Sequence, residues 1–294
     1  MPIRIGTRGS KLALVQTETV IKKLDDLGIE SEKIIINTQG DTTTHVPLHE
    51  IGGQGVFVRA LDDAILAGTI DCAVHSMKDI PAFRPSGLFT AAILKRDSPA
   101  DYLAHKGEFA HVRVIGTSST RRRAQLLRHD RGITIKDLRG NVDTRIRKMS
   151  AGEYDGIMLA EAGLQRLGIK IDGRRLPPEK FVPSPNQGTV AVVSRADPSL
   201  VEVLSALDHP ETRTDIAIER AVMEKLGGGC FTPLGIFSRG GHLIAEVLSL
   251  DGTRAERIEV DVKDIGQARE EGRKLKAKAQ GLIDEAYKQL GITG

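Results

Sequence analysis

Short apolar segments alternate with helical patterns along most of this chain of 294 residues. The runs 3–5, 113–115 and 133–138 read as strands, and each is followed by a turn and then by a helix-like segment. Strand–helix alternation of this kind predicts mostly parallel sheets with right-handed crossovers. Ligands of open α/β sheets bind beyond the carboxyl ends of the strands. The pattern therefore predicts an α/β protein whose site lies at its strand ends.

Two features divide the predicted fold into domains: a late apolar run, and a change from strand–helix alternation to a hairpin between helices. The run 190–194 follows a proline-rich loop and could return to the first sheet, which would give two α/β domains joined by two crossings, near Lys95 and near Gln187. A cleft between two such domains is the expected ligand site. After Pro210 a helix, a hairpin and a long helix at about 267–290 indicate a small antiparallel α+β domain. The expected domains are 1–95 plus 189–208, 96–188, and 209–294.

Positive charge is concentrated between Arg113 and Arg147. Nine Arg and one Lys stand there against three Asp, a local balance of +7 in a chain of net charge +3. Arg121–Arg123 fall in the first turns of a helix predicted over 120–129, directly after the turn 116–119. A helix N-terminus favours an anion, and guanidinium groups match carboxylate or phosphate bidentately. The segment indicates a ligand with several charged planar groups; the alternative is a solvated basic face.

Two further strand ends carry similar turns. The turn 139–141, Arg-Gly-Asn, follows one predicted strand and precedes a helix that carries Arg145. Arg8 and Ser10 follow the first strand, and Ser10 is a plausible N-cap of a helix that runs to Leu27 and buries that residue. Basic residues thus follow three of the predicted strands, at the point where each gives way to a helix.

The strand predicted over 71–75 runs straight into Ser76, Lys78 and Asp79. Taken singly, Asp79 reads as a cap or turn residue and Lys78 as a solvated charge. A buried strand that ends in His, Ser, Lys and Asp nevertheless places polar groups where ligands of α/β sheets bind. We interpret this strand end as part of a site.

The two cysteines, Cys72 and Cys230, read differently. Cys72 lies in an apolar strand and is interpreted as an inert core thiol. Cys230 follows three glycines, which leave its backbone free and cover it with little side-chain bulk. Such a cysteine could be a nucleophile or an attachment point. The alternative is a loop cysteine without a role.

Composition argues against several classes of protein. The N-terminus lacks the apolar core of a signal peptide and no window approaches a membrane span, so we expect a cytoplasmic protein. Two cysteines cannot form a disulfide framework, which suits a reducing compartment. Seven Phe, three Tyr and no Trp weaken a nucleic-acid interpretation, because single-strand binders stack bases on aromatic rings. No metal-ligand cluster is apparent, and we expect no metal.

Six segments, taken in order along essentially the whole chain, carry a specific resemblance to a known family. They are AVHSMKDIP (73–81), GTSSTRR (116–122), LRGNVDTR (138–145), EYDGIMLAEAGLQRLG (153–168), NQG (186–188) and GGGC (227–230). Together they resemble the hydroxymethylbilane synthase family, also called porphobilinogen deaminase. The resemblance implies two domains like a periplasmic-binding-protein hinge pair and a third that carries a dipyrromethane cofactor in thioether linkage. It also implies an enzyme that deaminates four porphobilinogen units, joins them head to tail and releases the linear tetrapyrrole by hydrolysis.

The resemblance also assigns roles to residues. Asp79 would be the catalytic carboxylate, which hydrogen-bonds pyrrole N–H groups, assists loss of ammonia and stabilises the resulting azafulvenium cation. Cys230 would hold the dipyrromethane, and Gln187 and Asn141 would lie near the site. The acetate and propionate groups of cofactor, substrate and growing chain would be bound by Arg8, Ser10, Lys78, Thr117, Ser118, Ser119, Arg121, Arg122, Arg139, Arg145 and Arg166. The partner would be the small molecule porphobilinogen, with neither nucleic acid nor membrane, and the protein would be a monomer.

Residues 52–60, GGQGVFVRA, depart from the family pattern GGKGLFVKE. Gln54 and Ala60 remove charges from the expected lid, the loop 39–55 and the start of the helix after it, and leave Asp79 and Cys230 in place. Two other classes stay open. One is a non-catalytic module that binds polycarboxylates or other anions in the same cleft. The other is an RNA-binding protein that uses the arginines, which the low aromatic content and nearly neutral total charge disfavour.

Overall fold

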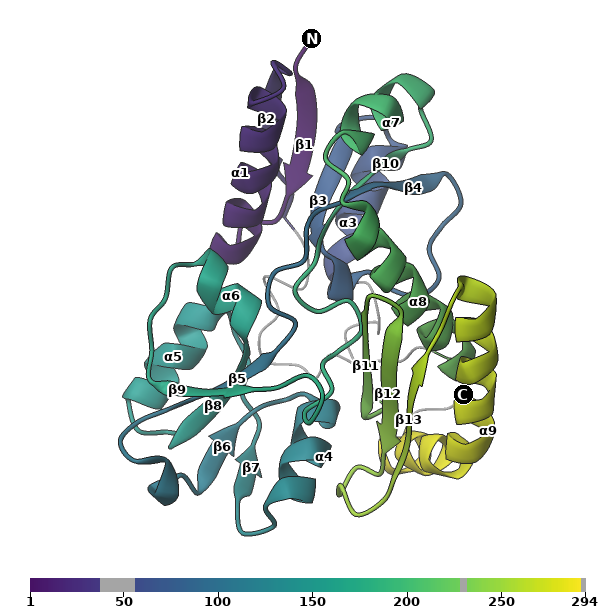
Figure 1. Cartoon of the computed structure of the whole chain (residues 1–294). Coiled ribbons are helices and arrows are strands. Elements are labelled where there is room, and N and C mark those ends of the chain that lie inside the picture. The colour runs from purple at the N-terminus through teal and green to yellow at the C-terminus, as the bar shows by residue number, and fades with distance from the viewer. Residues whose placement is uncertain (38–55, 228–231, 292–294) are drawn as a thin grey trace. The chain divides into compact units, whose positions relative to one another are not determined.

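The computed structural model describes residues 1–37, 56–227 and 232–291 (Figure 1). Cys230 and the expected lid 39–55, with Gln54, lie outside the described residues. The chain separates into two compact units. The first unit comprises Met1–Asp97 with Gly188–Arg213, and the second comprises Ser98–Gln187 with Thr214–Gly294. The further division of the second unit into two domains stays a prediction.

The first unit is built on a five-stranded sheet of order β2-β1-β3-β10-β4. Its strands are β1 (Ile3–Thr7), β2 (Ser31–Ile35), β3 (Cys72–Ser76), β4 (Leu88–Ile93) and β10 (Val190–Arg195). β1 runs parallel to β2 and β3, whereas β10 runs antiparallel to both β3 and β4. The late strand therefore does return to the first sheet, as predicted, and it is the reversed strand among the five.

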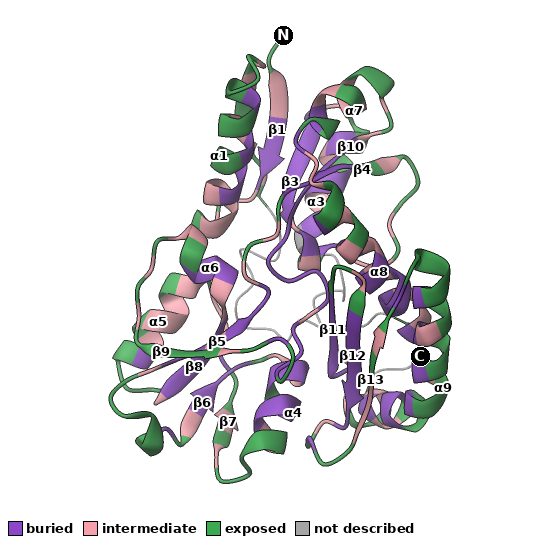
Figure 2. Ribbon diagram, viewed as in Figure 1, coloured by how far each residue is buried: buried purple, intermediate pink, exposed green. Residues whose placement is uncertain are grey.

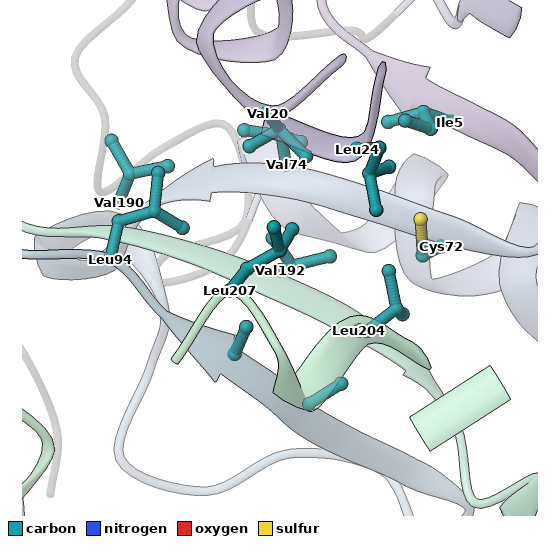
Figure 3. Packing of buried hydrophobic residues seen from close by; sticks show 12 residues of the cluster. Ile5, Val20, Leu24, Cys72, Val74, Leu94, Val190, Val192, Leu204 and Leu207 are labelled. Atoms are coloured by element: carbon teal, nitrogen blue, oxygen red, sulfur yellow. The ribbon is translucent and has the colours of Figure 1, made fainter. Parts of the chain in front are cut away.

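Helices α1 (Lys11–Asp25), α3 (Val56–Leu66) and α7 (Pro198–Ser205) contact this sheet. Val20 and Leu24 of α1 are fully buried with Cys72 and Val74 of β3, and Leu204 of α7 belongs to the same cluster (Figure 3). The two α1 residues are spaced by one helical turn and the two β3 residues by two positions, so each pair shares one face of its element. This burial fixes the position of β3, whose carboxyl end carries the predicted Asp79 site.

The second unit contains a five-stranded sheet of the same pattern, in the order β7-β6-β8-β5-β9. Its strands are β5 (Asp101–His105), β6 (Val114–Gly116), β7 (Thr134–Lys136), β8 (Gly156–Ala160) and β9 (Gly173–Leu176). Its helices are η2 (Phe109–His111), α4 (Thr120–His129), α5 (Val142–Ser150) and α6 (Glu161–Arg166). β6 is parallel to β7 and β8, and β5 is antiparallel to β8 and β9. In each unit the reversed strand is the one that directly follows a crossing of the chain between units.

The second unit also contains an antiparallel sheet of order β11-β12-β13. This part begins within α8 (Pro210–Leu226), whose residues up to Arg213 belong to the first unit. It continues with β11 (Leu234–Arg239), β12 (His242–Leu248), β13 (Ala255–Asp261) and α9 (Ile265–Gln289). α9 contacts β12 and β13. The predicted C-terminal α+β arrangement is confirmed.

The observed strands differ from the predicted ones at three places in the two large sheets, two of them edge strands. β5 and β9 have no counterpart in the prediction, and the strand predicted over 34–37 lies at 31–35. β2 and β9 are edge strands whose residues are half-buried or exposed, so they lack the apolar pattern that marks a strand. Figure 2 shows the contrast between β9 and the strands β3 and β10, which are almost wholly buried.

One helix end also differs from the prediction. Leu27 is 52% exposed, so the prediction that it joins the buried face of α1 is wrong. The helix ends at Asp25, and Gly28 adopts a φ of 75°, which turns the chain toward β2. Leu27 therefore lies past the last helical turn and has lost the helical spacing from Leu24.

Candidate active site

Asp79 closes a single 3-10 turn, η1 (Met77–Asp79), directly after β3. The turn is anchored on both sides of Asp79, because Met77 and Ile80 are each 2% exposed. The backbone N–H of Met77 also donates to the carbonyl oxygen of Thr189 at 2.9 Å. Asp79 itself is exposed. The structure thus presents one carboxylate to solvent at the carboxyl end of a buried strand, on a well-anchored turn.

Arg8 and Ser10 follow β1 at the same edge of the sheet. β1 and β3 are parallel neighbours in register, so residues that follow β1 lie beside those that follow β3. The hydroxyl of Ser10 accepts a hydrogen bond from the N–H of Ala13 at 3.3 Å, which confirms the predicted N-cap of α1. Arg8 and Lys78 are half-buried. Two half-buried cations and Asp79 therefore lie at the same edge of the sheet.

His75, one residue before the end of β3, is held neutral. Burial, together with the positive charges of Arg84 and Arg8, lowers the pKa of His75 to about 3. Arg84 in turn forms an ion pair with the buried carboxylate of Asp62 on α3. A proton on His75 would add a third positive charge in a buried place. The imidazole is therefore a neutral part of the support of this strand end.

In the second unit, the turn after β6 consists of Thr117, Ser118 and Ser119. The hydroxyl of Ser118 donates to the carbonyl oxygen of Leu138 at 3.1 Å and accepts from its N–H at 3.0 Å. The hydroxyl of Thr117 accepts from the N–H of Ser119 at 3.2 Å, and that of Ser119 caps α4 by accepting from the N–H of Arg122 at 3.4 Å. The three hydroxyl groups thus shape the turn between β6 and α4 and tie it to the end of β7. Their binding of ligand carboxylates stays a prediction.

Asp101, the first residue of β5, gathers three of the predicted site residues. Arg121 Nη1 lies 2.7 Å from one carboxylate oxygen, and Arg122 Nη2 lies 2.7 Å from the other. Gln187 Nε2 donates to the second oxygen at 3.1 Å. Asp101 is fully buried. Burial opposes its ionisation, but Arg121 and Arg122 outweigh burial and hold the pKa of Asp101 well below its ordinary value.

Arg121 and Arg122 are therefore internal residues with an internal counter-ion. They are 5% and 7% exposed, and they also donate to the carbonyl oxygens of Val182 and Met158. Sequence reasoning missed Asp101 because the charge lies in a short strand that was not recognised. The available signal was an Asp that opens the run DYLA in a chain rich in arginine.

Arg145 is in a different electrostatic position. Its Nε donates to the carbonyl oxygen of Gly140 at 2.7 Å. Burial, with the positive charges of Arg122 and Arg139, lowers the pKa of Arg145 to about 10. Arg145 is thus a partly buried guanidinium group whose charge is disfavoured by two neighbouring guanidinium groups. An anion placed among them would relieve that repulsion.

Arg166 and Asn141 complete the predicted set in this unit. Arg166 is the last residue of α6 and is half-buried. Asn141 precedes α5 in the N-cap position, makes no side-chain cap bond and is exposed. Gly140 adopts a φ of 112° in the turn before it, a conformation that L side chains rarely adopt. The structure places Asn141 in the same turn as Arg139.

Cys72 behaves as predicted for a core thiol. It is fully buried, and burial, with a smaller contribution from Asp71, raises the pKa of Cys72 to about 12. Figure 3 shows its sulfur among Ile5, Leu24 and Leu204. A protonated, inaccessible thiol is neither a nucleophile nor an attachment point. Cys230 is thus the cysteine to which the attachment prediction still applies.

Two broader features concern the described part of the chain alone. No helix among the described residues is long and apolar enough to cross a bilayer. Nor do those residues contain a group of three or more His, Cys, Asp or Glu that could hold a metal ion.

Family models match most of the chain. Residues 3–202 match the model described as porphobilinogen deaminase, dipyromethane cofactor binding domain. Residues 214–281 match the model described as porphobilinogen deaminase, C-terminal domain.

Archaeal relatives are similar over nearly the whole length. A probable porphobilinogen deaminase from Methanosarcina acetivorans is 50% identical, with 97% of this chain and 95% of that protein covered. One from Archaeoglobus fulgidus is 40% identical, with 96% and 100% covered.

Among solved structures, an ABC transporter periplasmic substrate-binding protein from Coxiella burnetii is similar to this chain. It is 15% identical, with a TM-score of 0.44 and coverage of 72% of this chain and 94% of that one. The α/β fold class follows from the strand orders of the two five-stranded sheets. Because the family models match residues 3–202 and 214–281 and a relative is 50% identical over nearly the whole length, the chain belongs to the porphobilinogen deaminase family.

Proposed function

We propose that this chain deaminates porphobilinogen and joins four of these molecules head to tail, on a dipyrromethane primer held by Cys230, to release linear hydroxymethylbilane. The reaction belongs to tetrapyrrole biosynthesis. Membership of the porphobilinogen deaminase family supports the proposal. The observation that carries it in this chain is the placement of Arg145, which bonds the turn of Arg139 through Gly140, near Arg139 and Arg122 in a partly buried place.

That cation cluster suits the ligand of the proposed reaction. Each pyrrole ring of porphobilinogen carries two carboxylates, so substrate, primer and growing chain are all polycarboxylates. Guanidinium groups bind carboxylates with charge-assisted and often bidentate hydrogen bonds. Arg139 and Arg145 are proposed to bind such groups directly. Arg122, held by Asp101 through Nε and Nη2, retains further N–H donors for the same ligand.

Asp79 is proposed to act on the reacting pyrrole. Its carboxylate accepts hydrogen bonds from pyrrole N–H groups and stabilises the cation that forms when the substrate loses ammonia. Stabilisation of developing charge by a fixed group is often the largest single contribution to catalysis. The anchored η1 turn suits this role, because it fixes the carboxylate before the substrate arrives. Arg8 and Lys78 on the same edge are proposed to hold the substrate's carboxylates.

The residues present fit the dipyrromethane that the family carries. The group has acetate and propionate side chains, and the basic turns with Arg139, Arg145 and Arg166 offer the matching cations. Cys230 is proposed as its attachment point, since a thiolate reacts readily with carbon electrophiles and a thioether resists hydrolysis. When attached, the group supplies the pyrrole end to which the first substrate unit is joined.

We further propose a cytoplasmic monomer that acts on small molecules and not on nucleic acid. The scarcity of aromatic residues and the two-cysteine composition support this part of the proposal. The alternative function is a non-catalytic module that binds polycarboxylates through the same arginines. It differs from the enzyme in needing neither Asp79 nor Cys230.

Intact-mass measurement after incubation with porphobilinogen tests the proposal. The wild-type protein should gain two linked pyrrole units, and peptide mapping should place them on Cys230. Cys230→Ser should lack the addition and be inactive, whereas Cys72→Ala is the matched control and should keep it. A wild-type protein that stays unmodified after this incubation contradicts the enzyme and leaves the binding module.

A further inference from the structure

Glu246 is a buried carboxylate in the centre of the C-terminal sheet. It lies on β12, the middle strand, and is 3% exposed. Because side chains alternate along a strand, Glu246 shares its face with Ile244 and Leu248, which are fully buried. Ile244 packs there against Phe237 and Val182. A carboxylate on this buried face of the sheet needs a counter-charge, since burying an unpaired carboxylate is costly in free energy.

Two guanidinium groups supply the counter-charge, and one of them comes from the arginine-rich helix. Arg257 Nη1, on the neighbouring strand β13, lies 3.7 Å from the carboxylate, and Arg128 Nη1, on α4, lies 3.6 Å from the same oxygen. Burial raises the pKa of Glu246, while Arg257, Arg128, Arg121 and, more weakly, His129 oppose that rise. Three of these four residues belong to α4.

The backbone of α4 is in close contact with the same sheet. Gly252, in the turn between β12 and β13, has a φ of 71°. A Cβ atom there would lie 2.2 Å from the carbonyl oxygen of Ala124 and 2.9 Å from the nitrogen of Arg128, both in α4. The turn and the helix therefore touch with no room for a side chain. The α4–sheet contact is a close-packed interface.

The segment before the second crossing is hydrogen-bonded to both α4 and the C-terminal sheet. Arg121 Nη1 and Gln125 Nε2 of α4 both donate to the carbonyl oxygen of Val182, at 2.9 and 2.7 Å. On the other side, the N–H of Ile236 in β11 donates to the carbonyl oxygen of Pro183 at 3.0 Å. One short segment thus links the arginine helix to the first strand of the C-terminal sheet.

We infer that Glu246 is a positioning residue that holds the sheet β11-β12-β13 in register with α4. The inference rests on the proposed function, which assigns Cys230 to the connection between α8 and β11 and ligand carboxylates to the arginine turns. If both assignments hold, the α4–sheet interface sets the distance between the attachment point of the cofactor and the groups that bind its carboxylates. Glu246 then matters for elongation more than for folding.

The test compares Glu246→Ala and Glu246→Gln with wild-type holoenzyme. Two quantities are measured: kcat and KM for porphobilinogen, and the mass distribution of protein carrying covalently bound pyrrole units. Both variants should still acquire the two-pyrrole addition. For Glu246→Ala, kcat should fall on the order of tenfold with KM nearly unchanged, as expected for misplaced reacting groups. The mass distribution of protein that carries covalently bound pyrrole units should then differ from that of wild type.

Glu259→Gln is the matched control. Glu259 also pairs with Arg257, at 2.8 Å, but its side chain is 49% exposed, and its ion pairs among the described residues are with Arg257 and His242 and not with α4. Its substitution should leave kcat and the mass pattern unchanged. If Glu246→Ala does not fold, Glu246→Gln decides, because it keeps the volume and removes the charge.

Wild-type kcat and a wild-type mass pattern in the folded variants would overturn the inference. A fall in kcat of the same size in Glu259→Gln would also overturn it. Failure of the proposed function gives a distinct result, namely wild-type protein without any pyrrole addition.

Discussion

The two five-stranded sheets share one strand pattern but carry opposite chemistry at their carboxyl ends. In the first unit the charged group that matters is an exposed carboxylate, Asp79, on a turn that is anchored by its apolar neighbours. In the second unit the charged groups are arginines. The carboxylate of Asp101 is fully buried there and is the counter-ion of Arg121 and Arg122. Two aspartates thus differ by burial: Asp101 is a structural counter-ion, whereas the exposed Asp79 is available for the role in the reaction proposed above.

The sharpest test of this contrast is Asp101→Ala, which should have the largest effect on stability. The substitution leaves Arg121 and Arg122 buried without their shared counter-ion, and removal of one side of a buried ion pair costs about 3–5 kcal/mol. The free energy of unfolding, measured by denaturant titration, should fall by that amount. Asp137→Ala, at an exposed aspartate of the same unit, should change it by less than about 0.5 kcal/mol.

The same carboxylate should also appear in the pH dependence of stability. The pKa of Asp101 is lowered in the folded protein, so its contribution is complete above its ordinary pKa of 3.8 and is lost as the pH falls below that value. The free energy of unfolding of wild type should therefore drop between about pH 4 and pH 2 by more than that of the variant. Parallel pH curves for the two proteins would mean that Asp101 is not the counter-ion described here.

Asp79→Ala should show the opposite behaviour, with a large effect on turnover and little on stability. The side chain is exposed and the turn is held by Met77 and Ile80, so the fold should be kept. Turnover of porphobilinogen should fall about a hundredfold or more, as for other groups that stabilise developing charge. Asp63→Ala, at an exposed aspartate of α3, is the control and should keep full turnover. Near-normal turnover in Asp79→Ala would remove the contrast between the two carboxylates.

The smallest expected effect tests the arginines themselves. Arg145→Leu removes a partly buried cation that other cations repel, so the free energy of unfolding should stay equal or rise slightly. At the same time kcat/KM should fall by about tenfold, the equivalent of one charge-assisted hydrogen bond. Arg123→Leu, at an exposed position of α4, should change neither quantity. Equal and negligible effects at both positions would make the cluster a solvated basic face.

The sequence by itself determined the parts of the fold that local patterns specify. Ser10 and Ser119 cap helices because the preference of hydroxyl residues for that place is local. The strand that leads to Asp79 could be recognised because it is a short apolar run that ends in polar residues. Its place at the carboxyl edge then followed from the alternation of strands and helices. The family motifs likewise lie in contiguous segments.

Tertiary structure alone decided which charges are paired and which are available. Arg121, Arg122 and Arg145 look alike in the sequence, yet two of them share a buried carboxylate and the third faces cations. Asp101 lies 20 residues before Arg121, on a strand without a recognisable pattern. Glu246 lies still farther along the chain and pairs with α4 across a sheet-to-helix contact. Burial and pairing depend on contacts between distant segments, and those set the energy of a charge far more than its neighbours in sequence do.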